Sequence, residues 1–386
     1  MSNATANSLL NQLIEQTTPS KTLQDKALLL KLQDCQLQIF SSSQALLDNL
    51  HDYFAELIEF VPASHLDAAA LKVFALESNA NLNFIEQLEW EDWAREAGKT
   101  GRKDAVFDGE FSEQTFRLVY KVKTGMVFFQ PSLTDQAQTS PLIAVGPVSQ
   151  HPNQIINFVL TQYLNQHLRH NWLLGHASGL KVEGKGISIA GLSGGGKSTL
   201  MLHLLEVGEH FISNDRLLFN ELDGKLIMRG IPKQPRINPG TIVHNPRLHS
   251  LMTEQERESF LAMPSEQLRA LEHKFDAPVN QLFGENCYQS EAALDALVIL
   301  NWSVSSPSET AIRVTNFSQS PELIPAILKS PGPFFNEANG AFLANGQTPT
   351  LEKIQQRMGR VPVLELNGKV DFGKAKQLVL GALQAV

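Results

Sequence analysis

The chain has few cysteines and no long apolar run, and these shortages narrow the kind of protein it can be. Its 386 residues include two cysteines, Cys35 and Cys287, which lie far apart and form no CxxC or Cys/His cluster. We therefore expect reduced thiols and no structural zinc. No apolar stretch approaches the roughly 20 residues that span a bilayer. The polar segment Met1–Ser8 also lacks the apolar core of a signal peptide, so we predict a cytoplasmic protein with no membrane partner.

Positive charge is also in short supply. The sequence has 32 Lys and Arg against 40 Asp and Glu, which gives a net charge of −8 and a pI near 5.8. This balance argues against nucleic-acid binding, because no set of cations is interleaved with aromatic residues. Hydrophobic residues make up 42% and charged residues 19%, which is typical of a globular protein. At about 150 residues per domain, the length predicts two domains.

The first region, residues 1–150, has the pattern of a small α+β domain. Alternating apolar residues predict strands at 35–40, 71–76, 115–123 and 126–130. Leucines at helical spacing after Ser41–Ser43 predict a helix from about residue 44 to 57. We place the domain boundary near residue 150 and expect the helical stretch 153–170 to lead into the second domain.

The second region, residues 151–386, alternates strands and helices and predicts an α/β domain. We expect strands at 176–182, 186–190, 211–213 and 293–301, and helices at 198–208, 352–358 and 374–385. A strand directly before a glycine-rich loop and a helix directly after it are the context in which a phosphate-binding loop occurs.

That loop matches the P-loop pattern G-x-x-x-x-G-K-[ST]. Glycines let backbone N–H groups approach phosphate oxygens, and the free N–H groups and dipole of the following helix favour an anion. Lys197 is predicted to bind the β- and γ-phosphates, and Ser198 to bind Mg²⁺. The sequence therefore predicts a nucleoside triphosphate site made by Gly191, Leu192, Ser193, Gly194, Gly195, Gly196, Lys197, Ser198 and Thr199.

Asp215 is the candidate for the second acidic group of this site. It follows the strand predicted at 211–213, whereas the strand predicted at 293–301 ends in Asn301-Trp302 without a carboxylate. A carboxylate at the end of such a strand faces the loop across the edge of the sheet. It is predicted either to hold Mg²⁺ or to accept the proton of an attacking hydroxyl. The alternative is an ordinary Asn-Asp turn.

These residues resemble the HPr serine kinase/phosphorylase superfamily. That family has a histidine before its P-loop and an Asp-Asp-Arg signature after it, matched here by His176 and by Asn214-Asp215-Arg216. Other segments resemble the HprK-related kinase B branch over nearly the whole chain; they are Gly98–Asp104, Lys121–Phe128, Gly230–Thr241, Leu271–Asp276 and Val370–Ala375. The resemblance implies a P-loop kinase domain similar to HPr kinase and phosphoenolpyruvate carboxykinase, preceded by a smaller α+β domain.

The resemblance also implies ATP and Mg²⁺ as cofactors, a homo-oligomer, and catalytic roles for His176 and Asp215. Two positions depart from the family's pattern. Asn214 stands where the family has its first Asp, and Thr199 stands where it commonly has Glu. Both changes remove a carboxylate near the metal site, which puts the reverse, phosphorylase reaction in doubt.

Four further side chains have two interpretations each. Lys233 and Arg236 lie in a Pro- and Gly-rich stretch, where they either face a phosphate or belong to a solvated loop. Arg216 either contacts phosphate or pairs with a carboxylate. His176 is either an active-site residue or an ordinary packed histidine.

A second basic stretch lies in the first region. Lys99, Arg102 and Lys103 either reach an acidic substrate or the nucleotide, or are simply solvated.

The sequence thus predicts an ATP-dependent kinase that transfers the γ-phosphoryl group to a hydroxyl acceptor, either a protein serine or a small molecule. Its catalytic set is Asp215, Lys197, His176 and Arg216. Two alternatives remain: a regulatory nucleotide hydrolase, and a non-catalytic nucleotide sensor with an N-terminal interaction domain.

Overall fold

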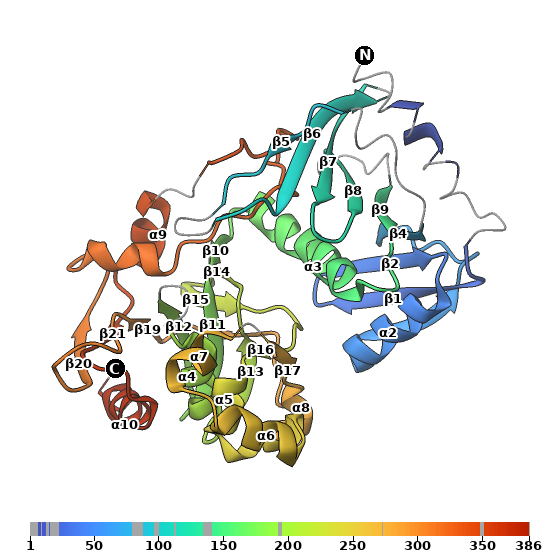
Figure 1. Ribbon diagram of the computed structural model, residues 1–386. Helices are drawn as coiled ribbons and strands as arrows, with labels where there is room; N and C mark the ends of the chain where they lie inside the picture. The colour runs from blue at the N-terminus through green and yellow to red at the C-terminus, as the bar shows by residue number, and fades with distance from the viewer. Residues whose placement is uncertain are drawn as a thin grey trace. The chain divides into compact units, whose positions relative to one another are not determined.

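The computed structural model divides the chain into two compact units (Figure 1). Unit 1 comprises Met1–Asn171 and Pro331–Thr348, and unit 2 comprises Trp172–Ser330 and Pro349–Val386. The structure describes residues 7–8, 10–12, 15, 23–78, 88–95, 100–111, 113–133, 141–191, 195–271, 273–347 and 351–385. The fold is mixed α/β.

Unit 1 is built on one mainly antiparallel sheet. Within the described residues, its strand order is β3-β1-β2-β4-β9-β8-β7-β6-β5, with β2, β4 and β9 parallel to one another. The strands are β1 (Lys26–Leu32), β2 (Cys35–Ser41), β3 (Ile58–Pro62), β4 (Leu71–Glu77), β5 (Glu91–Asp92), β6 (Asp104–Phe111), β7 (Gln114–Lys121), β8 (Met126–Pro131) and β9 (Leu142–Gly146). Helix α2 (Gln44–Phe54) begins after Ser43, whose side chain accepts a hydrogen bond from the Leu46 N–H and caps the helix.

Helix α3 (Pro152–Arg169) belongs to unit 1, although we expected it to open the second domain. Its Phe158 ring lies 4.9 Å from that of Phe128, and the Gln162 Nε2 donates to Gln130 Oε1 over 2.7 Å in the interior. These partners lie on β8, far from α3 in the sequence. The compact units therefore divide after α3, not near residue 150.

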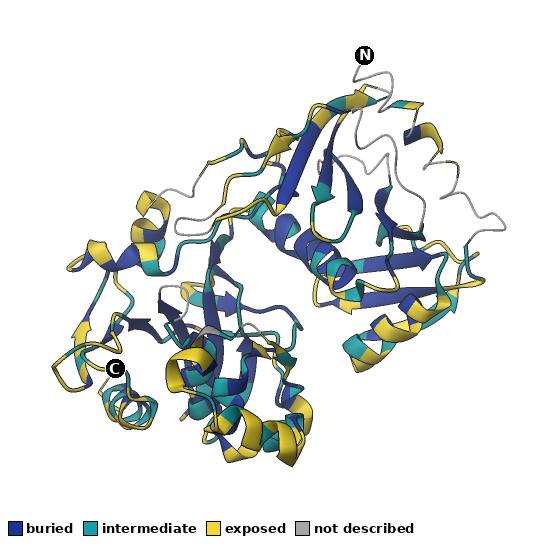
Figure 2. Cartoon of the chain, in the orientation of Figure 1, coloured by how far each residue is buried: buried dark blue, intermediate teal, exposed yellow. Residues whose placement is uncertain are grey.

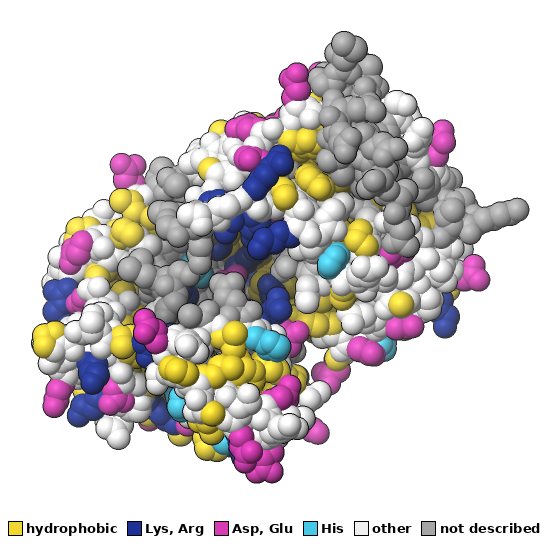
Figure 3. Space-filling model, in the orientation of Figure 1, with side chains coloured by type: hydrophobic (Ala, Val, Ile, Leu, Met, Phe, Trp, Pro, Cys, Tyr) yellow, Lys and Arg dark blue, Asp and Glu magenta, His cyan; other side chains and the backbone are white. Residues whose placement is uncertain are grey.

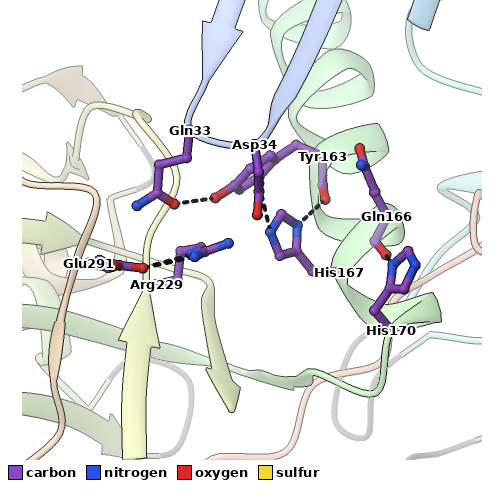
Figure 4. A network of polar contacts seen from close by, with 8 residues as sticks. All are labelled: Gln33, Asp34, Tyr163, Gln166, His167, His170, Arg229 and Glu291. Carbon is purple, nitrogen blue, oxygen red and sulfur yellow. Dashed lines mark hydrogen bonds and ion pairs between the residues drawn. The ribbon is translucent and has the colours of Figure 1, made fainter. Parts of the chain in front are cut away.

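The last turns of α3 are tied to the turn between β1 and β2 (Figure 4). Buried His167 lies 3.2 Å from the carboxylate of Asp34 and bonds through Nδ1 to the carbonyl of Tyr163. The Tyr163 hydroxyl donates to Gln33 Oε1. These side-chain contacts are a second reason why α3 groups with the sheet of unit 1.

Unit 2 contains a six-stranded sheet in the order β13-β11-β12-β19-β21-β20, counted over the described part of the chain. Its strands are β11 (Ala177–Val182), β12 (Lys185–Gly191), β13 (His210–Ser213), β19 (Ala296–Leu300), β20 (Ala311–Thr315) and β21 (Val363–Asn367). A smaller sheet has the order β10-β14-β15-β18, with β10 (Leu173–Gly175), β14 (Leu217–Leu222), β15 (Lys225–Arg229) and β18 (Glu291–Ala293). Strands β16 (Arg236–Ile237) and β17 (Phe275–Asp276) pair separately.

The strand expected at 293–301 is divided in two. Asp295 exchanges hydrogen bonds with Gly186, through its backbone N–H and its carboxylate, and this separates β18 from β19. The hairpin of β14 and β15 was not predicted; Asp223 and Gly224 form its turn, both with positive φ.

Helices cover the six-stranded sheet. Leu200 and Leu204 of α4 (Lys197–Leu205) pack in one core with Ile187 and Ile189 of β12, and α10 (Phe372–Leu383) joins the same core. In the described part of unit 2 the remaining helices are α5 (Pro239–Val243), α6 (Glu254–Leu261), α7 (Ser265–Ala270), α8 (Val279–Phe283) and α9 (Leu351–Met358), with short 3₁₀ turns at Pro246–Leu251 and Pro321–Ala326. A further 3₁₀ turn, Ala55–Leu57, follows α2 in unit 1.

Burial follows this layering. Figure 2 shows the central strands of unit 2 in the colour of buried residues, whereas α6 is mostly exposed. On the face drawn in Figure 3, acidic side chains are widely spread, in keeping with the net charge of −8. Within the described ranges, no helix combines the length and apolar character needed to cross a bilayer.

Candidate functional site

The sheet of unit 2 brings three predicted segments to one edge. Strands β12 and β13 both run antiparallel to β11, which lies between them, so their carboxyl ends share an edge with the start of β11. The register pairs Ala177 with Ala190 and Gly179 with Ser213. His176, the glycine loop (Gly191–Thr199) and Asp215 therefore emerge together, with the ends of β12 and β13 roughly 10 Å apart.

Two glycines shape the described part of the glycine loop. A Cβ on Gly191 would lie 2.8 Å from the Cβ of Leu300, and one on Gly196 would lie 2.5 Å from the ring of Phe372. Gly196 also has a φ of +90° and is the N-cap of α4, so both spacing and backbone angle favour glycine there. Leu192, Ser193 and Gly194 lie outside the described residues.

The predicted phosphate ligands follow directly. The buried Lys197 side chain donates from Nζ to the carbonyl of Gly191 over 2.9 Å, so it reaches back to the end of β12. Ser198 lies in the first turn of α4, where backbone N–H groups have no helical acceptor. The first turn of α4 thus combines a cation, a hydroxyl and the backbone N–H groups of a helix start, a set that suits an anion.

Three supports of the glycine loop were not predicted. Trp302 Nε1 donates to the Gly195 carbonyl over 2.8 Å, and its ring packs edge-on against Phe372. The hydroxyls of Thr199 and Thr241 lie 2.8 Å apart. These partners come from distant segments, so no local motif identifies them. The sequence shows only that Asn301-Trp302 ends the strand predicted at 293–301.

Asp215 is held by two of the residues predicted beside it. Its Oδ1 lies 3.2 Å from His176 Nε2 and its Oδ2 lies 3.6 Å from Arg216 Nε, while 41% of the side chain is exposed. Burial by itself raises the pKa of the Asp215 carboxyl, but the hydrogen bond from His176 and the positive charges of Arg216 and Lys329 outweigh it. The pKa is held well below its usual range, so Asp215 is a carboxylate at neutral pH.

Lys233 lies in the electrostatic field of the same carboxylate. Burial is the largest cause that lowers the pKa of the Lys233 amine, to about 8, and the positive charges of Arg216 and Arg236 add to it. Asp215 and Asp276 act in the opposite direction. Arg236 lies 3.3 Å from Asp276.

Electrostatic interactions thus link Lys233 with Asp215, Arg216 and Arg236, and Arg236 has a carboxylate partner of its own in Asp276. Lys329 was missed, because it follows the irregular segment Pro321–Ala326 and belongs to no motif.

The other basic stretch belongs to unit 1. Arg102 pairs with Asp92 there, and the Lys103 carbonyl accepts the Val122 N–H. Lys99 lies outside the described residues.

The residues predicted to bind Mg²⁺ offer suitable but sparse donors. Ser198 contributes a hydroxyl and Asp215 an ionised carboxylate, and no group of three or more His, Cys, Asp or Glu side chains in the described ranges forms a metal cluster. Mg²⁺ prefers hard oxygen ligands and commonly takes one or two from the protein and the rest from phosphates and water. The donor set fits a magnesium ion that arrives with a nucleotide.

Comparisons with known proteins give a distant structural likeness and no sequence match. No family model matches the chain, and no curated protein matches it. Among solved structures, the HPr(Ser) kinase/phosphatase from Coxiella burnetii aligns with a TM-score of 0.28 and 13% identity, over 55% of this chain and 91% of that one. The site geometry above stands independently of that likeness.

Proposed function

We propose that the chain is a nucleoside-triphosphate-dependent phosphotransferase, with ATP as the donor and a hydroxyl group as the acceptor. The observation that supports the proposal is the sheet edge shared by the ends of β12 and β13, from which Gly191 and Asp215 follow. His176 and Arg216 contact the Asp215 carboxylate and lower its pKa. Phosphoryl transfer depends mainly on positioning and charge stabilisation. In this proposal the glycine loop with Lys197 and the Asp215 carboxylate supply them.

The glycine loop is the donor side of the proposed site. The N–H groups at the start of α4 and the Lys197 ammonium hold the β- and γ-phosphates, and Lys197 gives up its bond to the Gly191 carbonyl when they bind. Ser198 and Asp215 would hold Mg²⁺. When bound, that ion neutralises charge on the phosphate oxygens.

Asp215 faces the acceptor side. In the reaction, the acceptor oxygen forms a bond to the γ-phosphorus, the bond from that phosphorus to the bridging oxygen breaks, and the nucleoside diphosphate leaves. A carboxylate with a lowered pKa is a weak base, so Asp215 acts chiefly by orienting the hydroxyl. The hydroxyl proton passes to it or to water as the new bond forms. His176 holds Asp215 in place, and Arg216 stabilises negative charge on the transferred group.

A nucleotide sensor is the second candidate, and two residues favour it. Asn214 and Thr199 lack the carboxylates of the family that the sequence resembles, and the Thr199 hydroxyl is already paired with Thr241. A sensor would bind ATP tightly without turnover. A regulatory hydrolase would release phosphate without labelling an acceptor.

The test compares substitutions on the two sides of the site. We expect Lys197→Ala to abolish ATP binding, and Asp215→Asn to leave binding within a few-fold but to slow transfer of label from γ-labelled ATP on the order of 100-fold or more. Candidate acceptors come from a native lysate divided by size into protein and small-molecule fractions. Asp223→Asn is the matched control, because Asp223 is exposed in the β14–β15 turn with a positive φ that asparagine tolerates.

The outcomes separate the candidates. Labelling of an acceptor that Asp215→Asn loses and Asp223→Asn keeps supports the phosphotransferase. Phosphate release without any labelled acceptor favours the hydrolase. Tight ATP binding without turnover, in the wild-type chain and in Asp215→Asn alike, favours the sensor.

A further inference from the structure

One peptide group of the glycine loop is bonded to a side chain from a different strand. Trp302, which lies just after β19, donates from Nε1 to the carbonyl of Gly195 over 2.8 Å. No peptide bond in the described ranges is cis. In a planar trans peptide, the carbonyl of one residue and the N–H of the next point in opposite directions. Because the Gly195 carbonyl points to Trp302, the N–H of Gly196 points away from it.

The backbone on both sides of Trp302 is fixed. The Asn301 N–H donates to the Leu366 carbonyl over 2.9 Å, and the Ser303 N–H donates to the Gly368 carbonyl over 3.0 Å. Both acceptors belong to β21 or to the residue that follows it. The indole is therefore attached to a segment that is bonded to the sheet just before and just after it.

The Asn301 side chain adds a buried anchor to this segment. Its Nδ2 donates to Glu365 Oε1 over 2.7 Å, and Arg313 Nε donates to Glu365 Oε2 over 2.6 Å. Glu365 is 5% exposed, so a buried carboxylate has a donor on each of its oxygens. Charge-assisted bonds of this kind are short and directional, and they hold Asn301 in one orientation next to Trp302.

The indole ring also rests on a second ring that contacts the glycine loop. It packs edge-on against Phe372, with the ring centres 5.3 Å apart. Phe372 is the residue that a Cβ on Gly196 would meet, and its ring stacks on His203 of α4 at 5.9 Å. The side chain that bonds the Gly195 carbonyl is thus in place before any ligand binds, which lowers the entropy cost of binding.

We infer that Trp302 is a positioning residue for nucleotide binding, which keeps the Gly196 N–H, and not the Gly195 carbonyl, turned towards the phosphates. The inference rests on the proposed function for the identity of the ligand. An N–H presents partial positive charge to an anion, whereas a carbonyl oxygen repels it. A peptide group between two glycines can turn over easily, because both residues accept a wide range of backbone angles. The bond from Trp302 opposes that rotation.

The test removes the donor and keeps a ring. Trp302→Phe lacks the indole N–H but leaves an aromatic ring next to Phe372. We expect its affinity for ADP with Mg²⁺ to fall on the order of 10-fold, the size of one hydrogen bond to a charged group. Affinity for AMP should be unchanged, because AMP lacks the phosphates that the start of α4 is proposed to hold. Trp93→Phe is the matched control, since it makes the same change under the Arg117 guanidinium in unit 1.

A second measurement uses the wild-type chain, so it does not depend on how well Trp302→Phe folds. The chain has four tryptophans, whose indole N–H signals are resolved by NMR after ¹⁵N labelling of tryptophan. The Trp302 signal is assigned by elimination, with phenylalanine variants of Trp90, Trp93 and Trp172. We expect its indole proton to exchange slowly with water both without ligand and with ADP bound. Fast exchange in the complex would mean that the bond to Gly195 is broken there, and would overturn the inference.

The binding results also separate this inference from the proposed function. Loss of ADP affinity in Trp302→Phe, with AMP affinity and the Trp93→Phe control unchanged, supports it. Unchanged ADP affinity, or an equal loss for ADP and AMP, overturns it while the proposed function stands. Failure of the wild-type chain to bind ATP contradicts the proposed function, and the inference with it.

Discussion

At neutral pH the Lys233 amine is a cation in the electrostatic field of two arginines and two carboxylates, and its burial has a cost in stability. Its pKa falls from 10.5 to about 8, with burial as the largest cause, followed by the opposed charges of Arg216 and Asp215 and then of Arg236 and Asp276. The lowered pKa means that the folded environment disfavours the charged form of this amine relative to water. Residues of this kind are often retained for binding.

The first prediction concerns the pH dependence of unfolding. Between about pH 8 and 10.5 the unfolded chain keeps the Lys233 proton and the folded chain releases it, so this residue makes the free energy of unfolding rise with pH. We expect Lys233→Met to remove on the order of 2 kcal/mol of that rise, after allowance for solvent screening. Denaturant unfolding across this range checks it, with the exposed Lys225→Met as control. Parallel curves for wild type and Lys233→Met would contradict the account.

At the scale of elements, the glycine loop depends on close packing between the start of α4 and the start of α10. Gly196 combines a φ of +90° with a Cβ position 2.5 Å from Phe372, whereas Gly224 has a φ of +73° and open space around it. The two glycines therefore separate backbone strain from steric conflict, because both positions disfavour alanine but only one lacks room for it.

The second prediction uses this pair. Gly224→Ala should lower the free energy of unfolding by about 1 kcal/mol through its backbone angle alone. Gly196→Ala should lower it by about 2–4 kcal/mol, because the methyl group also displaces Phe372. Gly196→Ala should also weaken ATP binding. The double variant Gly196→Ala/Phe372→Ala should recover only part of that affinity, since the strained angle remains. Thermal or denaturant unfolding measures the first difference. Equal costs at the two glycines would show that the packing against Phe372 does not hold.

Local patterns in the sequence predicted the helices and strands that flank the candidate site. The strand before the glycine loop and the helix after it are consecutive in the chain, and Asp215 follows a short strand, so periodicity and spacing were sufficient to predict these elements. Trp302 and Lys329 could not be found in this way. Their roles arise from a hydrogen bond to Gly195 and a charge beside Asp215, both made between segments distant in the sequence.

At the scale of the whole molecule, the chain leaves unit 2 after Ser330 and returns after Thr348. Arg117 holds the intervening segment within unit 1: its guanidinium pairs with Asp108 and donates to the carbonyls of Pro333 and Leu343. It also lies over the ring of Phe342. No local pattern predicts such a return. The sequence pattern likewise favoured a boundary near residue 150, whereas the compact units divide after α3, whose partners are remote in sequence.

This division locates the expected effect of a nucleotide. Every residue of the proposed site belongs to unit 2, so we expect nucleotide binding to act on that unit. Lys197 follows the end of β12, and Asp215 follows the end of β13. We expect both segments to be protected together when phosphates bind.

Hydrogen exchange with and without Mg²⁺ and ATP, followed by mass spectrometry, is the most direct test of the central claim that the glycine loop and Asp215 form one nucleotide site. We predict slower exchange in peptides that cover the start of α4 and the segment 213–216, in the wild-type chain and not in Lys197→Ala. No protection in either segment at saturating ATP, or protection that persists in Lys197→Ala, would contradict the account.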